Sequence, residues 1–354
     1  FFSVVIVDGR FVIFAVCLFA GECNLFEGRW VRGETPLLYY TNRTCRTIPF
    51  LRNCFLHGRE DTEFLRWRWK PENCELPRFS PERFFEIFRG KTVAFIGDSL
   101  ARNQVDSLLC MLSEVSGRRK TEASGEDPSA KWEFSSRNVT LLLLRSQFLV
   151  AASEIFVNGT STGGFRLHLD KLDAGWSEKL PTIDYAVFSD AHWFFRRNYL
   201  YQHGNLIGCV YCRDPNVTDL GPGFAIRRAF RAALDAVRDS DRSIFAAVRT
   251  YSPSHFENGT WNTGGVCDRT APTPVEETRR RATDREYRRI QVEEAAAAAA
   301  EVVDVTEMMT TRGDGHPGVH WGNRWMKGYS DCIHWCLPGP IDAWNELLLE
   351  VVRR

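Results

Sequence analysis

A strand that turns directly into a helix, at residues 91–112, is the feature that most constrains the fold of this chain. Residues 93–96 are Val-Ala-Phe-Ile, a short apolar and partly β-branched run that is typical of a buried strand. The turn Gly97-Asp98-Ser99 follows, and apolar residues then return at helical spacing, at Val105, Leu108, Leu109 and Leu112. The segment therefore predicts a strand, a tight turn and a helix in succession.

The same alternation continues along the chain. Short apolar runs predict strands at residues 140–144, 185–188, 244–248 and 302–305. Helical spacing or a high alanine content predicts helices at residues 225–237, 279–300 and 341–352, and the polar stretch 114–131 predicts a loop. Strands separated by helices predict an α/β fold, with a mainly parallel sheet covered by helices on both faces. Ligands of such sheets bind beyond the carboxyl ends of the strands, where we expect Ser99.

Ser99 is the first candidate for chemistry. A serine at the start of a helix lies near the positive end of the helix dipole, where an oxyanion would be stabilised. The alternative is a helix N-cap, in which Asp98 or Ser99 accepts a hydrogen bond from an amide of the next turn. Because Gly-Asp-Ser alone favours the capping role, an enzymatic role needs support from elsewhere in the chain.

That support comes from Asp331 and His334 near the other end of the chain. Their spacing of three lets both side chains lie on the same side of a helical turn, although a surface ion pair would have the same spacing. A serine hydroxyl needs an oriented base before it can attack. We therefore assign Ser99 as nucleophile, His334 as general base and then acid, and Asp331 as the group that orients His334.

Cysteine usage indicates the compartment. The chain has eleven cysteines, and Cys17 lies in the apolar N-terminal stretch, which leaves ten in the body. An even number fits disulfides in a secretory protein. Zinc is the alternative, because Cys209-x-x-Cys212 and Cys332-x-x-x-Cys336 have ligand-like spacing. Five glycosylation sequons favour an oxidising lumen, with acceptors at Asn42, Asn138, Asn158, Asn216 and Asn258.

We predict no metal site. His316 and His320 have zinc-like spacing only within a helix, and the intervening Pro317-Gly318 opposes a helix. Nucleic acid is also an unfavoured partner, because 45 Lys and Arg residues balance 45 Asp and Glu residues.

The composition suggests three regions in the 354 residues. Residues 1–21 are apolar but interrupted at Asp8-Gly9-Arg10, and the uninterrupted run 11–20 is shorter than the roughly 20 residues of a membrane span. We interpret this region as the remnant of a signal-anchor, with a leader-like segment as the alternative. Residues 22–79 are rich in cysteine and tryptophan and form a predicted N-terminal subdomain, and residues 80–354 form the predicted catalytic domain.

Several blocks resemble the plant trichome birefringence-like proteins, a family of polysaccharide O-acetyltransferases with an esterase-like fold of the Gly-Asp-Ser type. The resemblance extends over roughly residues 22–350 and lies in several blocks in the same order. These blocks are Cys-Asn-Leu-Phe-Glu-Gly-Arg-Trp-Val at 23–31, Phe-Leu-Arg-Trp-Arg-Trp-Lys-Pro at 64–71, Gly-Asp-Ser-Leu-Ala-Arg-Asn-Gln at 97–104, Arg-Thr-Tyr-Ser-Pro-Ser-His-Phe at 249–256, Asp-Gly-His-Pro-Gly at 314–318 and Asp-Cys-Ile-His-Trp-Cys-Leu-Pro-Gly-Pro at 331–340.

The resemblance implies an O-acetyltransferase that carries an acetyl group on Ser99 and passes it to a cell-wall polysaccharide. The variants at 74–79 and 252–259 favour a hemicellulose such as xyloglucan or mannan. The resemblance also implies localisation to the Golgi membrane with a lumenal catalytic domain. It implies no bound cofactor and an acetyl donor, for which acetyl-CoA is one candidate. Two alternatives stay open, namely a polysaccharide acetyl esterase and a wall-polysaccharide binding protein without turnover.

The resemblance further implies a disulfide scheme, with Cys209 and Cys212 left to pair locally. The remaining implied pairs are Cys23–Cys74, Cys45–Cys110, Cys54–Cys336 and Cys267–Cys332. Two of these bridges flank His334 and would stiffen the segment that carries it.

The residues around Ser99 supply candidates for oxyanion and substrate contacts. The Ser99 amide is the natural first donor, and Gly97 would allow close approach of substrate. Arg102 and Asn103 are side-chain candidates, with packing as the alternative. His192 is either a substrate contact or a structural histidine, and it follows Ala191 where the family usually has glycine.

Overall fold

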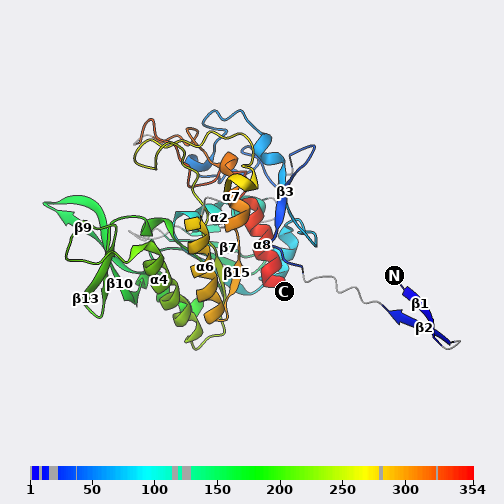
Figure 1. The fold of residues 1–354 in the computed structure, drawn as a ribbon. Coiled ribbons are helices and arrows are strands. Elements are labelled where there is room, and N and C mark those ends of the chain that lie inside the picture. The colour runs from blue at the N-terminus through cyan, green and yellow to red at the C-terminus, as the bar shows by residue number, and fades with distance from the viewer. Residues whose placement is uncertain are drawn as a thin grey trace.

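The centre of the molecule is a seven-stranded sheet (Figure 1). The computed structural model describes residues 2–7, 10–15, 23–36, 38–113, 119–121, 129–278, 282–323 and 326–354. Five neighbouring strands are parallel, and the last two continue antiparallel. In spatial order they are β15 (Glu301–Val303), β14 (Phe245–Arg249), β11 (Tyr185–Ser189), β5 (Lys91–Gly97), β8 (Val139–Arg145), β7 (Ala130–Phe134) and β6 (Arg119–Thr121).

Alternation along β5 builds a core on each face of this sheet. Val93 and Phe95 enter one core together with α1 (Pro81–Ile87), α2 (Ser99–Met111) and α8 (Asp342–Arg353). Ala94 and Ile96 enter the other core together with α3 (Ala174–Ser177), α4 (Gly221–Arg238) and α6 (Ala282–Ala297). Because successive side chains of a strand point to opposite faces, an uninterrupted apolar run suits a strand covered on both sides. The predicted α/β class with helices on both faces is confirmed.

A second sheet of four strands was not predicted. Its spatial order is β13 (Asn205–Val210), β12 (Asn198–Gln202), β10 (Thr160–Leu172) and β9 (Val150–Val157), and it forms the lobe at the left of Figure 1. Leu167, Leu200 and Val210 connect it to the core that contains α4. The polar, partly exposed residues of β9 and β10 hide the strand pattern, because only part of one face is buried.

The prediction of a loop at residues 114–131 is wrong where the structure describes it. Residues 119–121 form β6, and β7 begins at Ala130. β7 is recognisable only from its buried Trp132 and Phe134, since its other side chains are polar or small. Residues 114–118 and 122–128 of the predicted loop lie outside the described residues.

The cysteine-rich N-terminal region packs around a two-stranded antiparallel sheet, β3 (Gly28–Arg32) with β4 (Trp67–Pro71). Trp30 and Trp69 face each other across it in an edge-to-face arrangement with ring centroids 5.7 Å apart. The shorter helical segments of the chain are η1 (Phe50–Arg52), η2 (Glu63–Arg66), η3 (Leu180–Thr182), η4 (His192–Phe194), α5 (Val275–Thr278), α7 (Thr306–Thr310) and η5 (Gly313–Gly315).

The predicted signal-anchor remnant falls partly outside the described residues. Its described parts are β1 (Phe2–Val7) and β2 (Arg10–Ala15), which pair as an antiparallel hairpin. Among the helices of the described ranges, none combines the length and the apolar character that a membrane crossing requires.

Two tyrosines fasten the N-terminal region to α8. The Tyr40 hydroxyl donates to Asp342 Oδ1 over 2.7 Å, and the Tyr39 hydroxyl donates to Glu346. Asp342 is buried, and burial raises its pKa from 3.8 to about 7 even though hydrogen bonds from Ser107 and Tyr40 oppose the rise. The folded protein therefore retains a proton on Asp342 that the unfolded chain would release at lower pH.

We expect Asp342→Asn to flatten the dependence of stability on pH. Because the folded pKa of Asp342 is raised to about 7, its contribution is present below pH 4 and is lost as pH rises through 7. Urea unfolding should show the wild type losing about 3 kcal/mol relative to the variant between about pH 5 and pH 8. Asp241→Asn, at an exposed position, is the control. Equal slopes for wild type and Asp342→Asn would contradict the assignment.

Candidate active site

Ser99 is the first residue of α2 and lies at the carboxyl end of β5. Asp98 caps the helix, since its Oδ1 accepts from the Leu100 amide at 2.8 Å. Gly97 has φ +148°, and a Cβ placed there would lie 1.8 Å from the carbonyl oxygen of Ser189 on β11. Gly97 therefore has a structural role, because its close neighbour is another strand, and its role in the approach of substrate stays a prediction.

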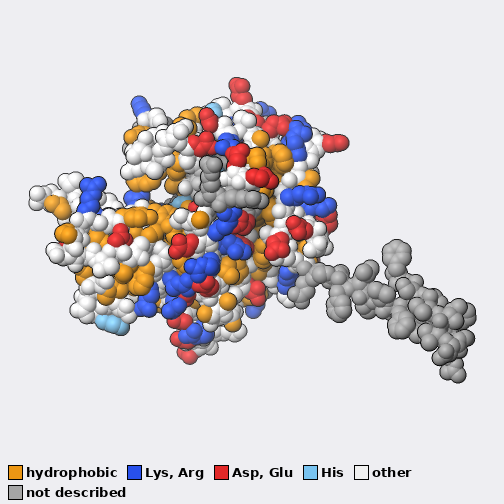
Figure 2. Space-filling view, in the orientation of Figure 1, with side chains coloured by type: hydrophobic (Ala, Val, Ile, Leu, Met, Phe, Trp, Pro, Cys, Tyr) orange, Lys and Arg blue, Asp and Glu red, His pale blue; other side chains and the backbone are white. Residues whose placement is uncertain are grey.

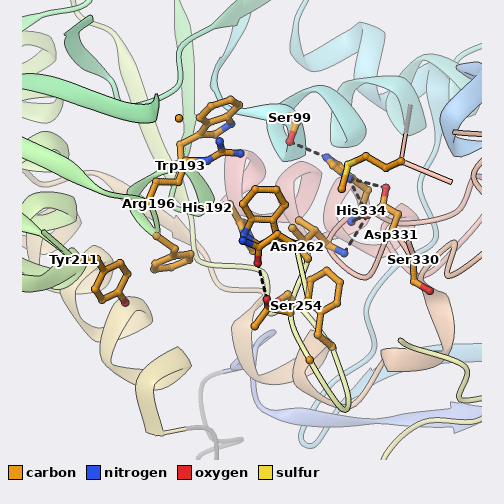
Figure 3. Close-up of a pocket in the computed structure, with 18 of the residues that line it drawn as sticks. Ser99, His192, Trp193, Arg196, Tyr211, Ser254, Asn262, Ser330, Asp331 and His334 are labelled. Atoms are coloured by element: carbon orange, nitrogen blue, oxygen red, sulfur yellow. Dashed lines mark hydrogen bonds and ion pairs between the residues drawn. The ribbon is translucent and has the colours of Figure 1, made fainter. Parts of the chain in front are cut away.

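His334 connects Ser99 to Asp331, which lie 232 residues apart in the sequence. The Ser99 hydroxyl donates to His334 Nε2 at 2.7 Å, and His334 Nδ1 donates to Asp331 Oδ2 at 2.9 Å (Figure 3). The predicted helical turn is not what joins the last two residues. Asp331 Oδ1 instead accepts from the amides of Ile333 and His334, so the carboxylate folds back over its own turn and meets the imidazole.

Asp331 is held as an anion. Burial by itself would raise its pKa, but the charge and the hydrogen bonds of His334 and the charge of Arg52 outweigh burial and lower the pKa well below the usual range. Arg52 Nη1 lies 3.1 Å from Asp331 Oδ2. A carboxylate that stays charged keeps the proton of His334 on Nδ1 and leaves Nε2 free to accept the serine proton.

Asn103 joins the helix of Ser99 to the segment of His334. Its Oδ1 accepts from the Trp335 amide at 2.8 Å and its Nδ2 donates to the Trp335 carbonyl at 3.3 Å. The oxygen and the nitrogen of the Asn103 side-chain amide thus bond the amide and the carbonyl of Trp335, respectively. The Asn103 side chain is fully buried. Asn103 therefore has a structural role in joining the two segments, and its role as an oxyanion donor stays a prediction.

The site now has the geometry of a serine esterase, and two family models match the chain. The model described as the GDSL/SGNH-like acyl-esterase family found in Pmr5 and Cas1p matches residues 76–351, and the PMR5 N-terminal domain matches residues 21–75. The chain belongs to this acyl-esterase family. The models meet at residues 75 and 76, four residues before the predicted boundary between 79 and 80.

Plant members of the family are similar over most of their length. Xyloglucan O-acetyltransferase 4 of Populus trichocarpa is 50% identical over 343 residues, which cover 94% of this chain and 81% of that protein. Xyloglucan O-acetyltransferase 2 of Arabidopsis thaliana is 43% identical, covering 94% and 83%. Protein trichome birefringence-like 25 of the same plant is 40% identical, covering 94% and 77%. The resemblance to the trichome birefringence-like proteins is confirmed.

The remaining predicted site residues of this esterase-family chain lie in different settings. Arg102 turns to Asp106, with Nε 3.6 Å from Oδ2. His192 lines the same cavity as Ser99, and its Nε2 donates to the Ser252 carbonyl at 2.9 Å. Burial lowers the pKa of His192, so this imidazole is held neutral as part of the wall. Ala191 is buried, and its amide points to Asp98 Oδ2 at 3.5 Å.

Two functional neighbours escaped sequence reasoning, namely Arg52 and Ser252. Ser252 Oγ accepts from the Trp335 indole at 3.1 Å, and Arg52 is the last residue of η1, two residues before Cys54. The implied bridge Cys54–Cys336 was the available signal for Arg52, because it brings residue 52 beside the 331–336 segment. No local pattern marks Ser252.

All ten cysteines of the body are paired in the structure, in the scheme that the resemblance implies. Two of the bridges, Cys267–Cys332 and Cys54–Cys336, flank His334. The others are Cys23–Cys74, Cys45–Cys110 and Cys209–Cys212. Within the described ranges no group of three or more His, Cys, Asp or Glu side chains is arranged to hold a metal ion.

A cavity of about 1350 Å³ opens from Ser99 and His334. Figure 2 shows the molecule notched between the lobe that carries β9, β10 and β13 and the loops above it. The cavity is lined from both sides, by Thr162 and Gly163 of β10 and by the loop at residues 256–262. Its volume exceeds the roughly 300–1,000 Å³ of typical small-molecule sites, so an extended ligand fits it better.

We expect Gly97→Ala to disrupt the site by separating β5 from β11. A methyl group 1.8 Å from the Ser189 carbonyl cannot be accommodated, and φ +148° disfavours any side chain. The variant should lose about 3 kcal/mol or more of stability in urea unfolding. Gly33→Ala is the control, since the nearest atom to its Cβ lies at 3.4 Å. A Gly97→Ala protein as stable as Gly33→Ala would show that the strands do not approach this closely.

Proposed function

We propose that this chain is a polysaccharide O-acetyltransferase that acts on xyloglucan. The observation that carries the proposal is the hydrogen-bonded set Ser99, His334 and Asp331 in the lining of a cavity of about 1350 Å³. The names of the relatives, at up to 50% identity, supply the reaction and the acceptor.

In the first half of the reaction Ser99 takes the acetyl group. Its hydroxyl proton passes to His334 Nε2 as Oγ attacks the acetyl carbonyl of the donor. The main-chain amide of Ser99 has no acceptor within its own helix, because it is the first residue of α2, and it serves as one oxyanion donor. His334 then protonates the leaving group, and an acetyl ester on Ser99 remains. Acetyl-CoA is a candidate donor.

In the second half a sugar hydroxyl replaces water as the nucleophile. His334 Nε2 takes the proton of that hydroxyl, the sugar oxygen attacks the ester carbonyl, and Ser99 leaves with the proton returned to its Oγ. The same residues would hydrolyse the ester if water arrived first. Transfer therefore depends on a groove that holds the sugar at high effective concentration beside Ser99.

We expect Ser99→Ala and Asp331→Asn to separate the roles. The purified chain is incubated with an acetyl donor and deacetylated or acetylated xyloglucan oligosaccharides, and mass spectrometry records the acetyl groups. Ser99→Ala should abolish transfer, and Asp331→Asn should slow it by about 10⁴-fold because the imidazole loses its orienting anion. Acetyl gain supports the transferase. Acetyl loss would instead identify an esterase, and binding without either reaction would identify a binding protein.

The cavity wall contains a stack suited to a sugar acceptor. The Arg196 guanidinium lies 4.1 Å from the ring centroid of Trp193 and 5.0 Å from that of Trp261, and so joins the β11 end to the 256–262 loop. Figure 3 shows Trp193, Arg196 and Tyr211 on the side of the cavity away from His334. Aromatic rings offer apolar faces to the C–H groups of sugars, and a guanidinium donates to their hydroxyls. We place the acceptor chain along this wall.

We expect Trp261→Ala to weaken the binding of the acceptor without slowing the acylation of Ser99. Trp261 is 40% exposed, so its truncation removes a cavity surface and little core packing. The KM for xyloglucan oligosaccharides should rise about tenfold, equivalent to about 1.4 kcal/mol. Acylation by a small activated acetyl ester should change less than about twofold. Phe156→Ala, another exposed aromatic that does not line the cavity, is the control. An unchanged KM would remove Trp261 from the acceptor site.

We further propose that the chain works as a membrane-anchored glycoprotein of the Golgi lumen. Five disulfides support an oxidising compartment. The sequon asparagines are accessible, since Asn138, Asn158, Asn216 and Asn258 are exposed and Asn42 is half-buried.

A further inference from the structure

Two buried histidines lie directly behind the catalytic segment. His255 Nδ1 and His316 Nε2 are 2.7 Å apart, and both residues are at most 5% exposed. The outer nitrogen of each ring meets a main-chain carbonyl. His255 Nε2 lies 2.9 Å from the Thr310 oxygen, and His316 Nδ1 lies 2.6 Å from the oxygen of His334. The two rings thus form a chain that ends on the residue that contacts Ser99.

The protons in this chain can be counted. A carbonyl oxygen only accepts, so each outer nitrogen must carry a proton. The inner contact of 2.7 Å is a hydrogen bond only if a third proton lies between Nδ1 and Nε2. Two neutral imidazoles supply one proton each, which is one fewer than the three contacts need. A neutral pair would leave one contact with two lone pairs facing each other.

We propose that His255 and His316 share one extra proton, and that this charged pair positions the main chain of His334. The proton sits between the two inner nitrogens, and both outer N–H groups donate to carbonyls. Trp335 supports the charge, because its ring stacks on His316 with centroids 4.0 Å apart and an interplanar angle of 22°. His255 also meets the edge of the same indole, with centroids 6.1 Å apart.

The charged groups around the pair come from several elements. Arg312 pairs with Asp314 on η5, and Arg59 donates to the carbonyls of Asp314 and His316. His334 and the anionic Asp331 lie on the segment that receives the His316 proton. A surface cavity of about 270 Å³ borders His316, and its charged or titratable lining comprises Arg59, Glu60, Asp61, Asp268, Arg269 and His320. The groups around the pair include both carboxylates and guanidiniums. The positive charge of the extra proton therefore does not meet surroundings that are only positive.

The consequence for catalysis rests on the proposed function of Ser99 and His334. The His316 N–H fixes the carbonyl of His334, and therefore the direction in which that residue presents its side chain. Removing the extra proton at alkaline pH breaks one of the three contacts and loosens this hold. The acetyl transfer rate should then decline on the alkaline side with the titration of one proton, to a plateau about tenfold lower at which the pair is neutral.

Nitrogen NMR of the full chain labelled at histidine tests the proton directly. At about pH 7.5, above the pKa of about 6.5 for a free imidazole, the wild type should show doubly protonated ring signals from the pair. Those signals should disappear in His255→Asn. Only neutral ring signals in the wild type, or charged signals that persist in His255→Asn, would overturn the proposal. This readout needs no substrate, so it holds whether or not the chain transfers acetyl groups.

The pH profile of transfer tests the positioning role. The amide of His255→Asn can donate to His316 Nε2 without carrying a charge, so this variant should lack the alkaline decline of the wild type. His320→Asn, whose ring contacts the His57 carbonyl outside the pair, should retain it. An alkaline decline in His255→Asn equal to that of the wild type would overturn the positioning role. If His255→Asn fails to fold, the wild-type NMR spectrum decides. If a small acetyl ester fails to acylate Ser99, the proposed function fails by itself.

Discussion

The active centre depends on two hydrogen bonds between the Asn103 side chain and the main chain of Trp335, one to its amide and one to its carbonyl. Asn103 lies one turn after Ser99 on α2, and Trp335 follows His334 directly. Two parallel contacts between one amide and the adjoining peptide units leave the two segments little freedom to slide. The pairing holds the helix of Ser99 beside the segment of His334, where the two side chains lie 2.7 Å apart.

Several further restraints meet at the same segment. Its two flanking disulfides link it to residues 54 and 267, and Arg52 reaches across to Asp331. The Trp335 ring is held between the Ser252 hydroxyl and the His316 ring. A site that must favour a sugar hydroxyl over water gains from such rigidity, because a small displacement of the base lowers the advantage of a correctly placed acceptor.

The cavity wall that is proposed to bind the acceptor is built differently from the segment of His334. Trp261 lies on an exposed loop, Trp193 belongs to η4 after strand β11, and the Arg196 guanidinium lies near both rings. The nucleophile thus lies on rigid elements of the large sheet, while the groove is completed by the second sheet and the upper loops. With this division, loops determine which acceptor binds, while the sheet holds the catalytic residues in place.

The sequence by itself determined the strand, turn and helix around Ser99 and the alternation that makes a parallel sheet, because both rest on local apolar periodicity. It also contained the three chemical roles at Ser99, Asp331 and His334. Tertiary structure alone decided how they meet. The turn at Asp331 closes through its own carboxylate instead of a helix, and Gly97 leaves room for the Ser189 carbonyl of the neighbouring strand. The second sheet, the roles of Asn103 and Arg52 and the contact between His255 and His316 depend on residues far apart in the chain. No local pattern encodes such contacts, since their free energy comes from neighbours that only the folded chain supplies.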